Sequence, residues 1–180
     1  MSELTVRADV FKAASLTGAD MDDLCYATEE AIKDGIGFQW LAAPAREVLE
    51  AYWKGVMLVP ERQLFLARLD GTVVGALQLV KPGAHKQTTA FAVRLEGHFV
   101  APFARGHGLA KSLLQLAEEE AIIAGFSVIR CDVRETQTRA IEIYESSGFV
   151  RWGLLPKYEQ IDGRYVAGHF FYKELTHVWL

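Results

Sequence analysis

The segment Val100–Ala110 has the residue types and spacing of an anion-binding turn. A strand-like run ends at Val100, and the chain then passes through Arg105, Gly106 and Gly108 into an amphipathic stretch. The first backbone N–H groups of a helix have no intrahelical partner and lie at the positive end of the helix dipole, so they bind phosphate well. Glycine lets that backbone approach a ligand without a Cβ atom in the way. The segment predicts a phosphate-binding loop, and the alternative interpretation is a plain turn before a helix.

The residues on either side of this loop predict the elements that position it. Thr88–Val100 is typical of a strand, Leu109–Ala124 places its leucines and alanines largely on one helical face, and Ser127–Val133 is typical of a second strand. Gly125 is expected to end the helix. A strand, helix, strand unit favours parallel pairing with a right-handed crossover. Ligands commonly bind at the carboxyl ends of such strands, where the loop lies.

A second segment that could do chemistry is Gln137–Phe149. Ala140, Ile141 and Tyr144 share one face of a predicted short helix, and Gly148 is a suitable C-terminal stop before a further strand. A tyrosine on such a face is either a core aromatic with its hydroxyl satisfied locally or a group that acts on a ligand. The phosphate-binding loop upstream favours the second interpretation of Tyr144.

Taken together, these two segments resemble the signatures of the GCN5-related N-acetyltransferases, the GNAT family. Arg105-x-x-Gly108-x-Ala110 is similar to the family pattern Gln/Arg-x-x-Gly-x-Gly/Ala, and Gln137–Phe149 is similar to Asn-x-x-Ala-x-x-x-Tyr-x-x-x-Gly-Phe in all but its first residue. Gln137 stands where the family has Asn, which puts any contact of the shorter amide in doubt. The resemblance implies the acyl-CoA N-acyltransferase (GNAT) fold over almost the whole chain.

The resemblance also implies a cosubstrate, acetyl-CoA, and no metal. Its pyrophosphate would meet the loop, and its pantetheine arm would lie between the two central strands, hydrogen-bonded to backbone that includes Val100. The residues implied to bind it are Val100, Arg105, Gly106, His107, Gly108, Leu109, Ala110, Gln137 and Tyr144.

Direct acyl transfer to an amine needs a neutral amine, a donor to the developing oxyanion and an acid for the departing sulfur. A backbone N–H near Val100 is the simplest oxyanion donor. Tyr144 is the candidate acid, because a phenol with a reference pKa near ~10 is protonated at neutral pH.

The base that removes the proton of the amine is expected on the strand before the loop. Period-two alternation places Arg94, Glu96, His98 and Val100 on one face if no bulge intervenes. Glu96 is the first candidate base, because a carboxylate attracts a cation and accepts its proton through water. His98 is the second, with a reference pKa near ~6.5. The alternatives are an ion pair of Glu96 with Arg94 on a solvated face and a structural histidine.

The remaining pattern predicts one α/β domain over residues 1–180. Further strands are expected at Thr5–Arg7, Gln63–Arg68, Thr72–Val80 and Gly168–Leu175, with another beginning near Phe149, and two further helices at Asp20–Asp34, N-capped by Asp20, and from Pro44 onward. Asp70-Gly71 and Asp162-Gly163 are hairpin turn signals. This order predicts a mixed, mostly antiparallel sheet with a central splayed parallel pair and helices on both faces.

Composition excludes several classes of protein. The 180 residues are 51% hydrophobic, enough for a sizeable single core, and no apolar run reaches membrane-spanning length. We therefore expect a cytoplasmic protein that binds no membrane. Cys25 and Cys131 suggest neither a disulfide framework nor a metal cluster, and the five histidines lack metal-binding spacing. A net charge of −4 with dispersed basic residues argues against a nucleic-acid partner. A homodimer is left open.

The acceptor is expected to be a small-molecule amine or a peptide. The resemblance implies a pocket lined by the connection between the first two helices and by the final hairpin, which contain the aromatic residues Phe38, Trp40, Trp152, Tyr158 and Tyr165. They form either a wall that attracts a cationic amine or ordinary core. The function is accordingly predicted to be acetyl-CoA-dependent N-acetylation of a primary amine, and the alternative is a non-catalytic acyl-CoA-binding or regulatory module.

Overall fold

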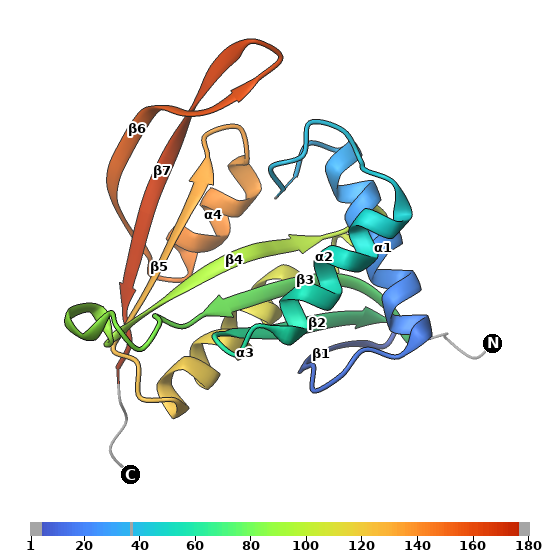
Figure 1. Cartoon of the computed structure of the whole chain (residues 1–180), viewed down its shortest axis with the longest axis horizontal. Coiled ribbons are helices and arrows are strands. Elements are labelled where there is room, and N and C mark those ends of the chain that lie inside the picture. The colour runs from blue at the N-terminus through green and yellow to red at the C-terminus, as the bar shows by residue number, and fades with distance from the viewer. Residues whose placement is uncertain (1–4, 37, 177–180) are drawn as a thin grey trace. The chain divides into compact units, whose positions relative to one another are not determined.

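The structure is a computed structural model that describes residues 5–36 and 38–176. The order of its strands and α-helices is the one that the sequence predicted (Figure 1). The elements, in chain order, are β1 (Ala8–Lys12), α1 (Gly18–Lys33), α2 (Arg46–Leu58), β2 (Arg62–Leu69), β3 (Thr72–Val80), the 3-10 turn η1 (Gln87–Thr89), β4 (Ala92–Val100), the 3-10 turn η2 (Pro102–Ala104), α3 (Leu109–Ile123), β5 (Val128–Arg134), α4 (Thr138–Ser146), β6 (Val150–Ile161) and β7 (Arg164–Glu174).

Two predicted boundaries near the N-terminus are wrong. The first strand lies at Ala8–Lys12 instead of Thr5–Arg7, because its pairing partner is the segment Phe65–Leu69 of β2. Helix α1 begins two residues before Asp20. Its N-cap is Thr17, whose hydroxyl accepts a hydrogen bond from the Asp20 backbone N–H at 3.1 Å, and the Asp20 carboxylate accepts one from the Thr17 N–H at 3.1 Å. This reciprocal capping box uses Asp20 three residues after the cap, not as the cap itself.

Two further predicted boundaries, the starts of a helix and of a strand, also differ from the structure. Helix α2 begins at Arg46, so Pro44 precedes it instead of opening it. The strand expected from Thr88 starts only at Ala92, because Gln87–Thr89 form the turn η1. The hairpin turns are confirmed: Asp70 and Gly71 have φ of 49° and 87°, and Asp162 and Gly163 have φ of 49° and 76°, as a type I′ turn requires.

Contacts divide the chain into two compact units. Unit 1 contains the described residues of Met1–Gln78 together with Gly97–Ala117, and unit 2 contains Leu79–Glu96 and the described residues of Glu118–Leu180. Strands β3 and β4 and helix α3 each contribute to both units. Each unit is described by itself below.

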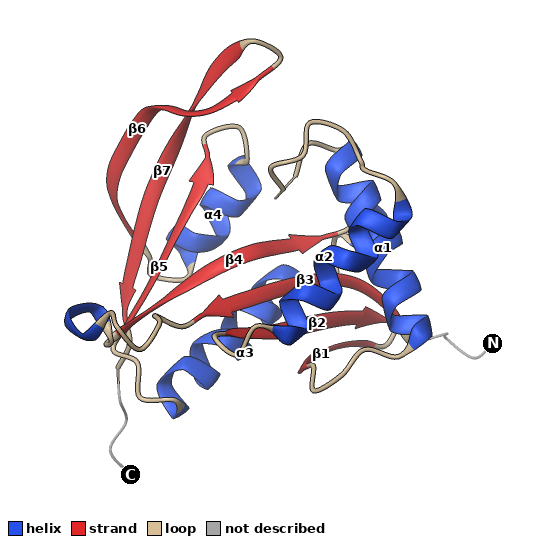
Figure 2. Cartoon of the chain, in the orientation of Figure 1, coloured by secondary structure: helices blue, strands red, loops and turns tan. Residues whose placement is uncertain are grey.

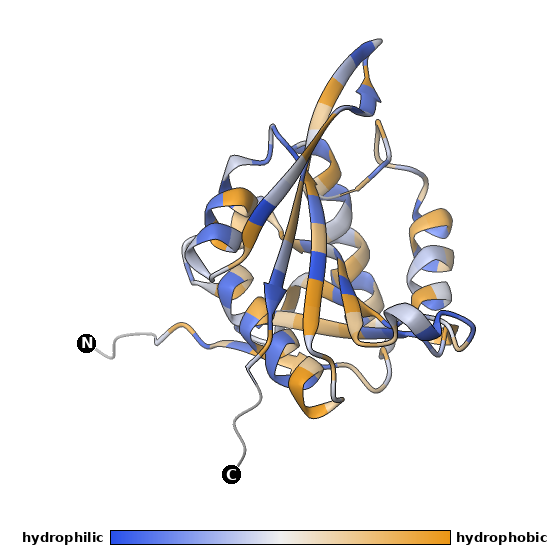
Figure 3. Cartoon of the chain, turned by 90° about the vertical axis from the view of Figure 1, so that its left-hand side faces the viewer, coloured by the Kyte–Doolittle hydropathy of each residue, from blue (hydrophilic) through white to orange (hydrophobic). Residues whose placement is uncertain are grey.

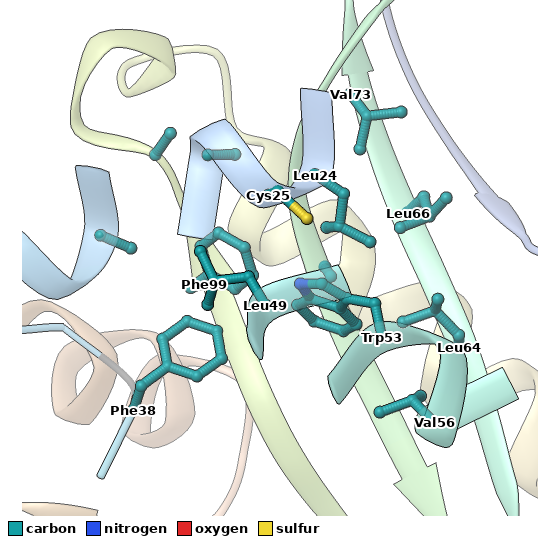
Figure 4. Close-up of a cluster of buried hydrophobic side chains, with 14 of the residues drawn as sticks. Leu24, Cys25, Phe38, Leu49, Trp53, Val56, Leu64, Leu66, Val73 and Phe99 are labelled. Carbon is teal, nitrogen blue, oxygen red and sulfur yellow. The ribbon is translucent and has the colours of Figure 1, made fainter. Parts of the chain in front are cut away.

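Unit 1 has helices on both faces of its strands. Helices α1 and α2 lie in front of the strands and the beginning of α3 lies behind them (Figure 1). The front layer is an apolar cluster in which Leu24 of α1 and Trp53 of α2 meet Leu66 of β2 (Figure 4). Phe65 and Ala67, the alternate residues of β2, are also fully buried, so both faces of this strand are covered.

Unit 2 is built on β5, β7 and β6. Strand β5 pairs with β7 in antiparallel register over its whole length, from Val128 opposite Glu174 to Arg134 opposite Gly168. Hydrophobic and hydrophilic residues are interspersed along the strands of the final hairpin (Figure 3). Helix α4 packs on this unit through Tyr144, whose ring centroid lies 5.8 Å from that of Phe171 on β7.

The strands follow the order β1-β2-β3-β4-β5-β7-β6 (Figure 2). The central pair is parallel: Ala92–Arg94 of β4 pair with Val128–Arg130 of β5, at the beginnings of both strands. The predicted mixed sheet with a central parallel pair is therefore confirmed, and it belongs to an α/β fold.

Candidate active site

The glycine loop lies in unit 1, between η2 and α3. Gly106 and Gly108 have φ of 86° and 72°, in the left-handed region that L side chains rarely adopt. No heavy atom lies within 4 Å of the position that a Cβ would take at either glycine. Both residues and His107 between them are exposed. The loop therefore presents bare backbone to its surroundings.

The first turn of α3 continues this surface. Ser112 N–H donates to the Gly108 carbonyl at 3.0 Å, so the helical hydrogen-bond ladder starts at Gly108. The N–H groups before Ser112 are those that a helix leaves without a helical partner, at the positive end of its dipole. Leu109 is buried and fixes the start of the helix on the core. Open glycines followed by a helix N-terminus form an arrangement that can bind an anion through backbone N–H groups.

Arg105 anchors the loop to α1. Its Nη2 lies 2.6 Å from Oδ2 of Asp34, the C-cap residue of α1. Beside it, the exposed ring of Phe103 stacks on Tyr26 of α1 with 5.6 Å between centroids. Sequence reasoning treated Arg105 as a cofactor ligand and missed Asp34, which is 71 residues away in the chain. In the structure Arg105 fixes the loop and adds positive charge to it.

His98 also connects to the start of α3. Its Nε2 lies 2.8 Å from the carbonyl oxygen of Ala110, so this nitrogen carries the hydrogen and donates. Burial lowers the pKa of His98 to about 4, and the hydrogen bond to Ala110 offsets only part of that shift. The ring is therefore neutral and weakly basic at neutral pH.

The alternation expected along β4 depended on an uninterrupted strand. Gly97 has φ of 56°, and a glycine in this conformation inside a strand is the usual mark of a β-bulge. Glu96 precedes this interruption, whereas His98 and Val100 follow it. The side chains of Arg94, Glu96, His98 and Val100 therefore cannot be assigned to one face by period-two counting, because that counting required an uninterrupted strand.

Tyr144 lies in unit 2, in the interior between α4 and β7. Its side chain is 5% exposed, and its ring packs on Phe149 at 5.4 Å and on Phe171 at 5.8 Å between centroids. Burial raises the pKa of Tyr144 well above its usual value, and the neighbouring carboxylate of Asp132 acts in the same direction. The phenol therefore stays protonated and is a hydrogen-bond donor throughout the physiological range.

Gln137 stands at the N-cap of α4, directly before the helix that carries Tyr144. Its side chain makes no capping hydrogen bond, although its carbonyl accepts from the Ile141 N–H at 3.1 Å. Asn is among the preferred N-cap residues because its short side chain reaches back to the first turn. Gln137 therefore occupies the N-cap position without capping α4 through its side chain.

Unit 2 contains a cluster of charged and aromatic side chains, of which the sequence predicted only a part. Glu96 and Arg94 form the ion pair that was the alternative interpretation, with 3.1 Å between Oε1 and Nη2. Arg94 also lies 4.0 Å from Asp132 of β5, whose carboxylate accepts a hydrogen bond from the Tyr158 hydroxyl. Burial and the neighbouring carboxylate of Asp132 raise the pKa of Tyr158. Sequence reasoning missed Asp132, although its position two residues before the end of β5 was a usable signal.

The aromatic residues proposed for the acceptor divide between the units. In unit 1, Phe38 is a core residue in contact with Trp53 and Phe99, and Trp40 is a partly buried neighbour of Phe38 at 5.9 Å. In unit 2, Trp152 and Tyr165 are exposed by 64% and 58%.

Cys25 and Cys131 are both buried and free, and burial raises the pKa of the Cys131 thiol. Within residues 5–36 and 38–176 no group of three His, Cys, Asp or Glu side chains could hold a metal ion; His177 lies outside the described residues. Among the helices that the structure describes, none has the length and apolar character to cross a membrane.

Comparisons with known proteins find similar acetyltransferases. Residues 25–149 match the model of the acetyltransferase (GNAT) family. An uncharacterized N-acetyltransferase of Azospirillum brasilense, from the hisH-hisA intergenic region, is 53% identical over 140 residues, which cover 77% of this chain and 80% of that protein.

Solved structures are similar over nearly the whole chain. A GCN5-related N-acetyltransferase from Kribbella flavida has a TM-score of 0.76 at 25% identity, covering 93% of this chain and 98% of the other. The yncA protein of Salmonella typhimurium, solved with its cofactor acetyl-CoA, has a TM-score of 0.76 at 18% identity and covers 95% of each chain.

Proposed function

Since this chain belongs to the GNAT family of acetyltransferases and is an N-acetyltransferase, we propose that it transfers the acetyl group of acetyl-CoA directly to a primary amine of a small molecule or peptide. The observation that carries the proposal is the glycine loop, with two left-handed glycines and open space where their side chains would be. Such a loop before a helix N-terminus binds phosphate through backbone N–H groups.

Acetyl-CoA supplies the activated thioester. The backbone from Gly106 to Ala110 would hold its pyrophosphate, with Arg105 adding a positive charge that Asp34 orients. Backbone at Val100 would hold the pantetheine arm. His107, Leu109 and Gln137 complete the proposed set: His107 is exposed in the loop, Leu109 anchors the helix start, and Gln137 begins α4.

The residues of this chain then have three tasks. A backbone N–H near Val100 stabilises the oxyanion that develops on the carbonyl. Tyr144 donates a hydrogen bond, and finally its proton, to the departing sulfur. Its raised pKa supports a donor role, because the phenol is never ionised near neutral pH, and makes hydrogen-bond stabilisation of the thiolate the larger part of its effect.

The third task is to accept the proton of the amine. We propose Glu96 as the base, acting through water, and His98 as the second candidate. Glu96 is partly exposed, and its Oε1 lies 3.1 Å from Nη2 of Arg94. His98 is the second candidate because burial lowers its pKa to about 4 and its Nε2 is bound to the Ala110 carbonyl oxygen.

One observation favours a second function, that of a non-catalytic acyl-CoA-binding module: Gln137 replaces the asparagine of the family pattern and leaves α4 without its side-chain cap. Both functions require binding of acetyl-CoA. They differ in whether an added amine releases CoA.

The test is an acceptor panel. The purified protein is mixed with acetyl-CoA and with small amines, amino acids and peptides, and free thiol is measured over time. We expect thiol release that depends on at least one acceptor and saturates with its concentration. Binding of acetyl-CoA by calorimetry, without acceptor-dependent thiol release from a broad panel, would replace the enzyme by the binding module.

A further inference from the structure

Gln78 is a polar side chain in a fully buried stretch of β3. Its exposed fraction is 0%, and its neighbours Leu77 and Leu79 are buried apolar residues. Both ends of its amide are hydrogen-bonded within unit 1. Oε1 accepts from Arg62 Nη1 at 2.7 Å, and Nε2 donates to the Tyr52 hydroxyl at 3.0 Å. A buried amide that is satisfied on both ends has a fixed orientation.

This amide lies against the interruption in β4. A Cβ at Gly97 would be 2.8 Å from Nε2 of Gln78, a separation too short for two such atoms. Gly97 also has its left-handed φ of 56°. The Gln78 amide therefore occupies the space in which a side chain at residue 97 would lie, and it packs on the Gly97 backbone from β3.

Two more contacts from β3 fix the residues that follow. A Cβ at Gly75 would lie 2.5 Å from the carbonyl oxygen of Phe99 and 3.1 Å from Cα of Val100. The carbonyl of Val74 accepts the Ala101 N–H at 2.8 Å. Strand β3 thus contacts β4 at Gly97 and at Phe99–Val100, and it contacts Ala101, the residue after β4. In this series the Gln78 side chain is held in place by hydrogen bonds to Arg62 and Tyr52.

We propose that Gln78 is a positioning residue for the acetyl transfer, a proposal that rests on the function proposed above. Held by Arg62 and Tyr52, its amide sets the backbone at Gly97 and thereby the direction of the peptide N–H near Val100 that meets the thioester oxygen. Hydrogen-bond donors to an oxyanion work only when they are oriented beforehand, so loss of the amide lowers the rate of the chemical step while the pyrophosphate loop stays intact.

The test compares two substitutions at this residue. Gln78→Met keeps the length of the side chain and removes both hydrogen bonds. Gln78→Glu keeps the shape and the partner Arg62, and the Tyr52 hydroxyl can then donate to it. We expect about tenfold lower kcat in Gln78→Met, with the Kd for acetyl-CoA little changed, because a small misplacement of a reacting group is costly in rate. Gln78→Glu should recover most of the wild-type rate.

A matched control separates positioning from loss of stability. Thr28 is also fully buried in unit 1, and its hydroxyl accepts a hydrogen bond from Trp53 Nε1 at 3.1 Å. Thr28→Val removes that buried hydrogen bond and leaves Gln78 and its two hydrogen-bond partners unchanged. It should lower the melting temperature, as Gln78→Met does, and leave kcat near the wild-type value. An equal fall of kcat in both variants overturns the proposal.

The backbone is also observed directly, without any acceptor. In isotope-labelled protein the amide NMR signals of Gly97–Ala101 should shift in Gln78→Met and return toward their wild-type positions in Gln78→Glu. Unchanged signals in a folded Gln78→Met variant overturn the positioning role. Failure of the wild-type protein to acetylate any acceptor would instead refute the proposed function, and the NMR comparison would still decide whether Gln78 sets this backbone.

Discussion

Burial affects a tyrosine and a histidine of the candidate site in opposite ways. It raises the pKa of Tyr144, whose neutral form is the proton donor, and it lowers the pKa of His98, whose neutral form is the base. Both shifts favour the uncharged side chain, because charge is costly to bury. The result is a dependable donor at Tyr144 and a weak acceptor at His98.

Tyr144→Phe removes the hydroxyl and keeps nearly all of the ring packing on Phe149 and Phe171. We expect the affinity for acetyl-CoA to change little and the rate of the chemical step to fall on the order of 10²-fold, the usual contribution of a general acid. Single-turnover kinetics measure that step even where product release limits turnover. The control is Tyr172→Phe on β7, and an unchanged single-turnover rate in Tyr144→Phe would make Tyr144 a core aromatic only.

His98 makes the stability of the fold depend on pH. Its pKa is lowered from 6.5 to about 4, so the unfolded chain takes up a proton first as the pH falls. The stabilisation is complete above about pH 6.5, is lost progressively toward pH 4, and amounts to at most about 3 kcal/mol. As the pH falls through this range, the melting temperature of His98→Gln should decrease less than that of the wild type. His107→Gln, a control at an exposed histidine, should show the same pH dependence of the melting temperature as the wild type. If the melting temperatures of all three proteins change in parallel with pH, His98 is not the source of the pH dependence.

The residues that sequence reasoning missed share one property, which is that their partners are distant in the chain. Asp34 holds Arg105, Asp132 accepts from Tyr158, and Gln78 packs on Gly97. The motif residues themselves were found because their spacing along one loop or one helix is local. Pairs that form only when strands and helices come together leave no such spacing.

At the scale of elements, sequence signals that depend on a few consecutive residues predicted the positions of turns and helices accurately. The extents of β3 and α3, the two Asp-Gly turns and the loop before α3 were predicted to within a residue. Errors occurred where tertiary pairing sets the boundary, as in β1, or where a short turn takes the place of the first residues of an expected strand, as η1 does before β4.

Gly108 tests the loop as an element. In Gly108→Val a branched side chain enters open space that we assign to phosphate, and the left-handed φ of 72° adds strain of about 1–2 kcal/mol. We expect a folded protein by circular dichroism with no detectable acetyl-CoA binding by calorimetry. Gly71→Val in the turn between β2 and β3 has a similar φ of 87° and equally open surroundings, so it should be strained alike and bind normally. Normal binding by a folded Gly108→Val would remove Gly108 from the phosphate site.

At the scale of the whole molecule, the order of elements along the chain and the parallel pair of β4 and β5 were predictable, because parallel neighbours need a long crossover connection, usually a helix. A single domain over residues 1–180 stays a prediction. The division into two units, with β3, β4 and α3 shared between them, had no signal in composition, because the chain changes unit within elements instead of at a linker.

Acetyl-CoA should stabilise the whole fold. Ligand at about a hundred times its dissociation constant adds roughly 2.7 kcal/mol to the free energy of unfolding. For a chain of this length that raises the melting temperature by roughly 5–10 °C. Thermal melts with and without acetyl-CoA measure the shift, and Gly108→Val should show none. A wild-type protein whose melting temperature does not respond to millimolar acetyl-CoA would contradict binding.

The central claim is direct transfer of acetyl from acetyl-CoA to an amine, and the ratio of the two products tests it most directly. With the best acceptor of the panel, CoA is quantified by its free thiol and the acetylated amine by mass spectrometry in the same samples. The account predicts one acetylated amine for each CoA released at every time point. Release of CoA without acetylated amine, or binding of acetyl-CoA with neither product, would contradict it.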